Sequence, residues 1–152
     1  MQQSGLNIHL QGEEVLYLPT IVEAAESSPA AAKEAASVIR KFLSKDNYDR
    51  PHVQYNGIML VRILVDNPGR TFTRNLDAKF VGTVKDLLKQ GKDLSVQQIL
   101  RESLDVFENE RKDDEGLVPM LEMWAKEKKA IEKMYGGVGS AHQSMALENP
   151  AS

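Results

Sequence analysis

RPHVQYNGIMLVRILVDNPGRTFTRNLDAKFVGTVKDLL, residues 50–88, is the stretch of this chain that decides its fold. It joins a nearly all-apolar segment that begins at Pro51 to an amphipathic segment, through the turn Asn67-Pro68-Gly69. Pro68 disfavours continuation of a helix, and Gly69 can take a positive φ without a Cβ penalty. A helix that is apolar on most sides must be wrapped by other helices. The first segment is therefore predicted to be the central helix of a small all-helical domain.

Outside this stretch, apolar residues recur at steps of three and four, which is typical of helices that pack on a core. Before it, the sequence predicts a short helix over 13–17, a break at Pro19, a second helix over 19–27 and a third over 29–44. The break is expected because proline lacks an N–H and disfavours the α conformation at the residue before it. Ser28 and Pro29 form a good helix start, a capping hydroxyl followed by proline at the first helical position.

After the turn, helices are predicted over 75–89, 94–110 and 116–134. The helix after Pro51 should bury residues on more than one face, including Ile63, and its Gly57 indicates close approach of another helix. Other positions expected to face the core include Ala32, Ala35, Ala36, Ile39, Phe42 and Leu43 of the helix over 29–44, Leu76, Phe80, Val84, Leu87 and Leu88, and then Val96, Ile99, Leu100, Ser103, Leu104 and Phe107.

The fold class predicted from this pattern is all-α, with seven to eight antiparallel helices stacked into a right-handed superhelix. Residues 1–12 lack a helical period and are expected to be extended or frayed. The helical domain should cover 13–135. Residues 136–152, GGVGSAHQSMALENPAS, have the small, polar composition of a flexible linker to a further domain.

Composition narrows the classes of function. Of 152 residues, 41% are hydrophobic and 27% charged, an ordinary globular balance. The absence of cysteine rules out disulfides and thiolate chemistry and is compatible with the cytoplasm. No secretion signal and no run of 18 apolar residues is present, so any membrane role is expected to be peripheral. A formal net charge of -3 argues against a nucleic-acid partner.

No catalytic set, metal site or cofactor site is predicted. The three histidines lie far apart in sequence, and none has an acidic residue or cysteine at ligand spacing in a convincing pattern. We therefore expect a protein that acts by binding and not as an enzyme.

Three motifs resemble those of VHS domains, the helical modules of endosomal and endocytic sorting adaptors, within the wider VHS and ENTH superfamily. They are Pro51-His52-Val53 at the start of the apolar helix, Asn67-Pro68-Gly69-Arg70-Thr71-Phe72 after it, and the amphipathic segment 80–88. The resemblance covers about residues 13–135. It implies a vesicle-trafficking adaptor that works at the cytoplasmic side of endosomal, Golgi or plasma membranes, often with a GAT-like helical bundle after the VHS domain.

Ubiquitin binding is the activity most widely shared among VHS domains, and it uses an apolar patch led by a tryptophan on the second helix. The resemblance places this tryptophan position at Val15, with Leu18 and Pro19 further along. The aromatic anchor of the patch is thus replaced by valine, so only weak ubiquitin contact is expected.

Some VHS domains read acidic dileucine sorting signals in a groove between two helices. The resemblance places this peptide groove at Val96, Ile99 and Met123. A basic residue expected near Val96 is absent, which removes the main electrostatic contact to an acidic peptide.

A basic stretch offers a third contact, with anionic lipids such as phosphoinositides. Arg70, Arg74 and Lys79 lead this stretch, and each cation near such a surface contributes about 1 kcal/mol. The alternative is a solvated helix face.

Two other readings stay open. A CTD-interacting domain of the same superhelical type binds phosphorylated tails of RNA polymerase II through an Asp-Ser pair, for which this chain has Arg62-Ile63. A pure scaffold, in which the helices only position a following domain, predicts no ligand.

Overall fold

The computed structural model describes the backbone of residues 14–139 and the side chains of residues 21–134. Over this part of the chain all regular structure is helical, with seven α-helices and two short 3-10 helices, as the sequence predicts. The chain divides into two compact units, residues 1–121 and 122–152. Each unit is described by itself below.

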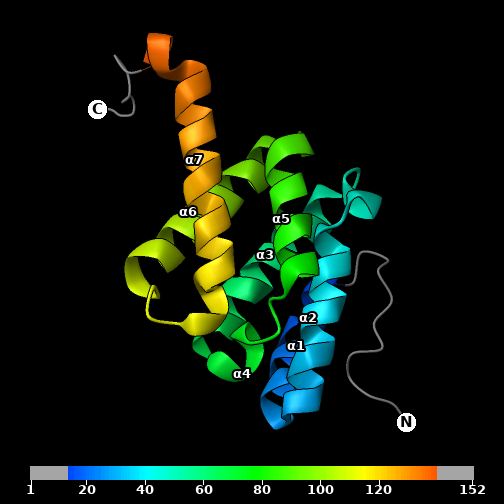
Figure 1. Ribbon diagram of the computed structural model, residues 1–152. Coiled ribbons are helices and arrows are strands. Elements are labelled where there is room, and N and C mark those ends of the chain that lie inside the picture. Colours follow the sequence, from blue (N-terminus) through cyan, green and yellow to red (C-terminus); the bar gives the residue numbers. More distant parts are fainter. Residues whose placement is uncertain (1–13, 140–152) are drawn as a thin grey trace. The chain divides into compact units, whose positions relative to one another are not determined.

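The first unit begins with α1, Glu14–Ser27, a single helix that continues through Pro19. The predicted break at this proline is wrong. A proline inside a helix costs about 3 kcal/mol, mostly through one lost hydrogen bond and a clash with the carbonyl of the preceding turn. Packing offsets this cost, because α1 lies against α2 and α3 and buries Ile21 and Ala25. Figure 1 shows α1 and α2 side by side.

The next helix, α2, spans Pro29–Leu43 and starts as predicted. The Ser28 hydroxyl accepts a hydrogen bond from the Ala31 N–H at 3.1 Å, which satisfies one of the donors left free at a helix start. One apolar face is buried: Ala32, Ala35, Ala36, Ile39, Phe42 and Leu43. A 3-10 turn, η1, Lys45–Asn47, follows and leads to the central helix.

The central helix, α3, spans Pro51–Asp66 and contacts α1, α2 and α6. Its Gly57 marks the predicted close approach, since a Cβ there would lie 3.1 Å from the Cβ of Phe42. One expectation fails: Ile63, predicted to be buried, is 39% exposed. The helix is covered on most of its circumference but not all of it.

The turn after α3 holds a cis peptide bond between Asn67 and Pro68, and Gly69 takes a φ of 77°. A one-turn helix that the sequence did not reveal, α4, Arg70–Thr73, follows directly and buries Phe72 and Thr73. Four residues are too few to show helical periodicity, so this element was invisible to pattern analysis.

Two amphipathic helices follow, α5 at Ala78–Gln90 and α6 at Leu94–Glu110. Each has an aspartate at its N-cap: Asp77 accepts from the Phe80 N–H and Asp93 from the Val96 N–H, both at 2.9 Å. Both buried stripes match the sequence prediction in full. Helix α5 starts three residues later than predicted, because α4 and its turn take up residues 70–77.

In the first unit α3 contacts α1, α2, α4 and α6. Helix α2 contacts α1, α4 and α5 as well, and α5 contacts α6. The 3-10 turn η2, Glu115–Leu117, touches α4 and precedes the first residues of α7. Apolar side chains of α2 to α6 meet in one core, whose largest fully buried members include Phe42, Phe72, Phe80, Ile39, Leu60, Leu64, Leu87 and Leu104.

The second unit, where the structure describes it, is the continuation of α7, Val118–Gly139. The helix runs five residues past its predicted end at 134. Glycine in a helix interior costs about 1 kcal/mol relative to alanine. For this reason Gly136 and Gly137 led to the prediction that the helix ends before them. Within this unit the Lys128 ammonium lies 5.6 Å from the Trp124 ring centroid, a cation–π contact. Residues 1–13 and 140–152, the predicted N-terminal segment and most of the predicted linker, lie outside the described residues.

Candidate functional site

The exposed side of α3 carries an apolar stripe. Tyr55, Met59 and Ile63 follow each other at steps of four, which places them on one helix face. Tyr55 and Ile63 are each 39% exposed, and Met59 is half-buried. We call these three residues the α3 stripe. Tyr55 contributes an aromatic ring to the surface, Met59 a thioether and Ile63 a branched aliphatic chain, all on the central helix of the first unit.

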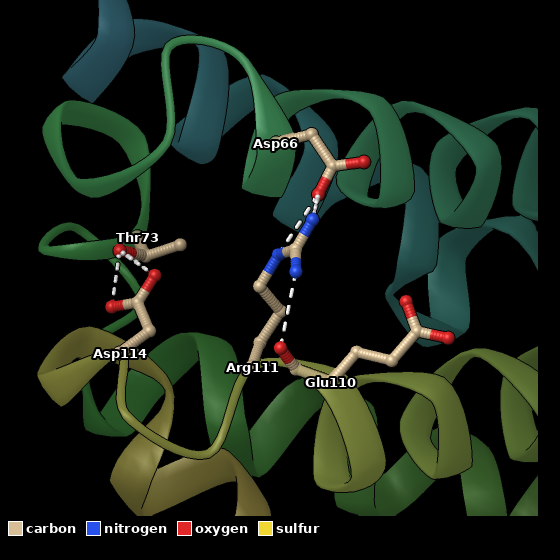
Figure 2. Close-up of polar contacts among 5 residues, drawn as sticks. All are labelled: Asp66, Thr73, Glu110, Arg111 and Asp114. Atoms are coloured by element: carbon tan, nitrogen blue, oxygen red, sulfur yellow. Dashed lines mark hydrogen bonds and ion pairs between the residues drawn. The ribbon is translucent and has the colours of Figure 1, made fainter.

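Charged and polar groups border the α3 stripe on the side of α6. Arg62 Nη1 lies 3.9 Å from Glu102 Oε1 on α6, a half-exposed ion pair. At the end of α3, Arg111 donates two hydrogen bonds to Asp66 Oδ1, from Nη2 at 2.6 Å and from Nε at 3.0 Å (Figure 2). These bonds to the carboxylate, and then its charge, raise the pKa of Arg111. The two pairs tie α3 to α6 and form a polar border along one side of the apolar stripe.

A second feature of the first unit is an open depression between α4 and η2, with a volume of about 400 Å³. Its base holds a buried polar pair, in which the Thr73 hydroxyl lies 2.9 and 3.0 Å from the two carboxylate oxygens of Asp114 (Figure 2). Asp114 Oδ1 also accepts from the Gly116 N–H at 2.9 Å. Two donors thus hold the carboxylate, and the contacts fix η2 against α4.

The residues predicted for lipid contact are brought together in part. Arg70 and Arg74 both line this depression, and both are exposed. Arg70 also donates to the Asp113 carbonyl at 3.3 Å. Lys79 is exposed near the start of α5 but is not among the lining residues. Asp114 and Glu115 line the same depression, so its charge is mixed.

The residues predicted for the peptide groove are covered. Val96 is 1% and Ile99 8% exposed, and both belong to the core of the first unit. Met123, 8% exposed, belongs to the second unit. In this conformation the side chains offer almost no surface to a peptide, and the groove stays a prediction.

The residues predicted for the ubiquitin patch, Val15, Leu18 and Pro19, have side chains outside the described residues. Their helix, α1, contacts α3. The patch therefore stays a prediction on a helix next to the one that carries the α3 stripe.

The α3 stripe was not predicted from the sequence, although the sequence contains a signal for it. Four polar residues of α3, His52, Asn56, Arg62 and Asp66, recur at steps that place them on one side of the helix, whereas Gln54 is buried. Helical spacing places Tyr55 and Ile63 on this same side, which is the exposed one.

The described residues offer no group of three or more His, Cys, Asp or Glu side chains that could hold a metal ion. Within the same limits, no helix is long and apolar enough to cross a membrane. Comparison of the chain with known protein families, with curated proteins and with solved structures finds no match.

Proposed function

We propose that this chain is a non-enzymatic protein-interaction module of a vesicle-trafficking adaptor, similar to VHS domains and with their right-handed superhelix of antiparallel helices. In this proposal it works in the cytoplasm at the surface of endosomal, Golgi or plasma membranes. Its partners are ubiquitin or other proteins of the sorting machinery. The exposed α3 stripe carries the proposal.

The composition of the α3 stripe supports a role in protein binding. Interfaces have an apolar centre with a polar rim and are enriched in tyrosine and methionine. Tyr55 supplies a rigid amphipathic contact, and Met59 an adaptable one. Arg62 and Asp66 lie in the polar border and are already tied to α6, so they cost little side-chain entropy when a partner binds.

The neighbourhood of the stripe supports ubiquitin as the partner. The patch implied by the resemblance lies on α1, and α1 contacts α3. A partner seated on α3 would therefore bind a helix that contacts the helix of Val15, Leu18 and Pro19. The absence of tryptophan from that helix makes the α3 stripe the main apolar anchor in this proposal.

The experiment is an NMR titration of the isotopically labelled chain with unlabelled ubiquitin. We expect saturable shifts centred on residues 55–63, and a loss of affinity of about tenfold or more, on the order of 1.4 kcal/mol, in Ile63→Asp. The matched control is Leu94→Asp, because Leu94 is 83% exposed on α6 and lies away from the stripe in sequence. Shifts centred elsewhere, or equal losses in both variants, would refute the assignment.

A second contact, with anionic lipids, is favoured by Arg70 and Arg74, which line one depression. Asp114 and Glu115 reduce its positive potential, so weak and strongly salt-dependent binding is proposed. Co-sedimentation with vesicles that contain a phosphoinositide tests it. Arg70→Gln with Arg74→Gln should abolish binding, whereas Lys129→Gln, which removes an exposed lysine from the second unit, should not.

The reading as a CTD-interacting domain is not favoured. Arg62, which occupies the position of the peptide-binding aspartate, is paired with Glu102. A fluorescence titration with a phosphorylated heptad-repeat peptide should give no phosphate-dependent binding.

A further inference from the structure

A separate polar pocket lies between η1 and α5 in the first unit. Its volume is about 250 Å³, and its lining consists of Ser44, Lys45, Tyr48, Thr83, Asp86 and Gln90. We call it the Tyr48 pocket. None of its residues belongs to the α3 stripe or was singled out from the sequence.

The Tyr48 hydroxyl is the unusual group in this pocket. The oxygen is covered, yet it makes no hydrogen bond in the part of the chain that the structure describes. A buried polar group without a partner costs about 1–3 kcal/mol, so such a group calls for an explanation. Burial, and then the negative charge of Asp86, raises the pKa of Tyr48. The phenol therefore stays protonated at neutral pH and can donate.

Of the five other lining residues, Gln90 is an exposed amide, and the remaining four fall into two classes. The hydroxyls of Ser44 and Thr83 already donate to backbone carbonyls of their own helices, at 2.9 and 3.0 Å. Lys45 and Asp86, in contrast, form no salt bridge among the described residues. The pocket thus holds a donor in Tyr48, a cationic donor in Lys45 and an anionic acceptor in Asp86.

We propose that the Tyr48 pocket binds a carboxamide, the side chain of a glutamine or asparagine in a partner peptide. The amide oxygen would accept from the Tyr48 hydroxyl and Lys45, and the amide NH₂ would donate to Asp86. A carboxylate would be attracted by Lys45 but repelled by Asp86. An ammonium would be attracted by Asp86 but repelled by Lys45. An amide presents both an acceptor and a donor without net charge.

The size of the pocket agrees with this ligand. Pockets for drug-sized molecules begin at about 300 Å³, and a water molecule occupies about 30 Å³ of liquid. A volume of about 250 Å³ therefore suits one side chain with its flanking backbone. Because the Tyr48 oxygen is covered, a rim side chain must move aside first. Lys45 and Gln90 are the long, exposed side chains among the lining residues, and both have room to move.

The test is an NMR titration of the full chain with N-acetylglutamine amide. We expect saturable shifts over residues 44–48 and 83–90 in the millimolar range. Tyr48→Phe should weaken binding at least tenfold, and Asp86→Asn should weaken it as well. Tyr55→Phe, the same change on the exposed face of α3, is the matched control and should bind like the unchanged chain.

Stability separates a binding role from a structural one. Because Tyr48→Phe removes an unsatisfied hydroxyl, it should unfold at the same or a higher urea concentration while it loses the ligand. A strongly destabilised Tyr48→Phe would show that the hydroxyl has a structural partner and would overturn the proposal. The proposal would also be overturned if the titration gave no shifts, as expected if water alone fills the pocket. Equal binding of acetate or methylammonium and of the amide would overturn it as well. The proposed role of the α3 stripe is tested by different residues and does not depend on this result.

Discussion

Thr73 and Asp114 show how much one buried polar pair can matter. Thr73→Val keeps the shape of the side chain but removes the hydroxyl that lies 2.9 and 3.0 Å from the carboxylate oxygens of Asp114. The buried carboxylate then loses a donor, so we expect the free energy of unfolding to fall by about 1–3 kcal/mol. Urea denaturation measures the change.

Thr71→Val is the control for this prediction. Thr71 lies on the same one-turn helix and is half-buried. Within the described part of the chain, its hydroxyl makes no hydrogen bond. Its free energy of unfolding should change by less than about 0.5 kcal/mol. Equal losses in the two variants would mean that the Thr73 hydroxyl has no special role.

Tyr48 predicts a dependence of stability on alkaline pH. Its pKa in the folded protein is raised from the ordinary 10.0, chiefly by burial and further by Asp86. Above pH 10 the unfolded chain releases the phenol proton before the folded chain does. This contribution to stability is therefore complete below pH 10 and is lost as the pH rises towards the folded pKa.

The measurement is ultraviolet titration of tyrosinate together with urea denaturation from pH 9 to 11. Asp86→Asn should bring the pKa of Tyr48 closer to its ordinary value, and Tyr48→Phe should remove this part of the alkaline loss of stability. A Tyr48 that titrates at or below pH 10 would contradict the prediction.

At the scale of elements, Gly57 and Gly82 form a natural pair for comparison. A Cβ on Gly57 of α3 would lie 3.1 Å from Leu43 Cδ2 and from Phe42 Cβ, whereas one on Gly82 of α5 would meet nothing within 4 Å. Alanine favours a helix over glycine by about 1 kcal/mol. Gly82→Ala should therefore stabilise the protein by up to that amount.

Gly57→Ala should have the opposite effect. The Cβ of Phe42 is fixed to the α2 backbone, so the crowding costs about 1–3 kcal/mol and outweighs the gain in propensity. Circular dichroism during urea denaturation reports both changes. If the two variants gain stability alike, α2 and α3 are not in close contact at Gly57.

Elements with both a periodic face and a defined start could be predicted from the sequence. Helix α2 has Ser28 before Pro29, and the buried stripes of α2 and α6 came out as predicted. The prediction was wrong at Pro19, where the tendency of proline to break a helix is outweighed by the packing of α1. Helix α4 was not predicted, because it is too short to show a helical period. Local propensity is a weak signal once tertiary contacts compete with it.

Across the whole molecule, the core was far more predictable than the surface. Burial of Val84 or Leu104 follows from repetition along a helix, and repetition is visible in a sequence. The Tyr48 pocket instead depends on η1 and α5 meeting in space, and no local pattern joins Tyr48 to Asp86. The α3 stripe lies between these cases, because its residues are local but their exposure depends on where α1 and α6 stop covering α3.

The core of the first unit also holds a small apolar cavity of about 20 Å³, where side chains of α2, α3, α5, α6 and the start of α7 meet. Ser103 is the one lining residue with a polar side chain, and its hydroxyl donates to the Ile99 carbonyl at 2.6 Å. A water molecule there would lack the two to four polar partners that it needs, so the cavity should be dry.

Val84 lines the cavity, and Val84→Ile would place one more carbon in it. We expect a gain in the free energy of unfolding of about 0.8 kcal/mol, the value of one buried methylene. Val81→Ile, at a half-buried position of α5 that does not line the cavity, should change stability by less than about 0.5 kcal/mol. If Val84→Ile lowers the urea midpoint, the void is too narrow for a carbon atom, and strain in the surrounding side chains exceeds the gain from burial.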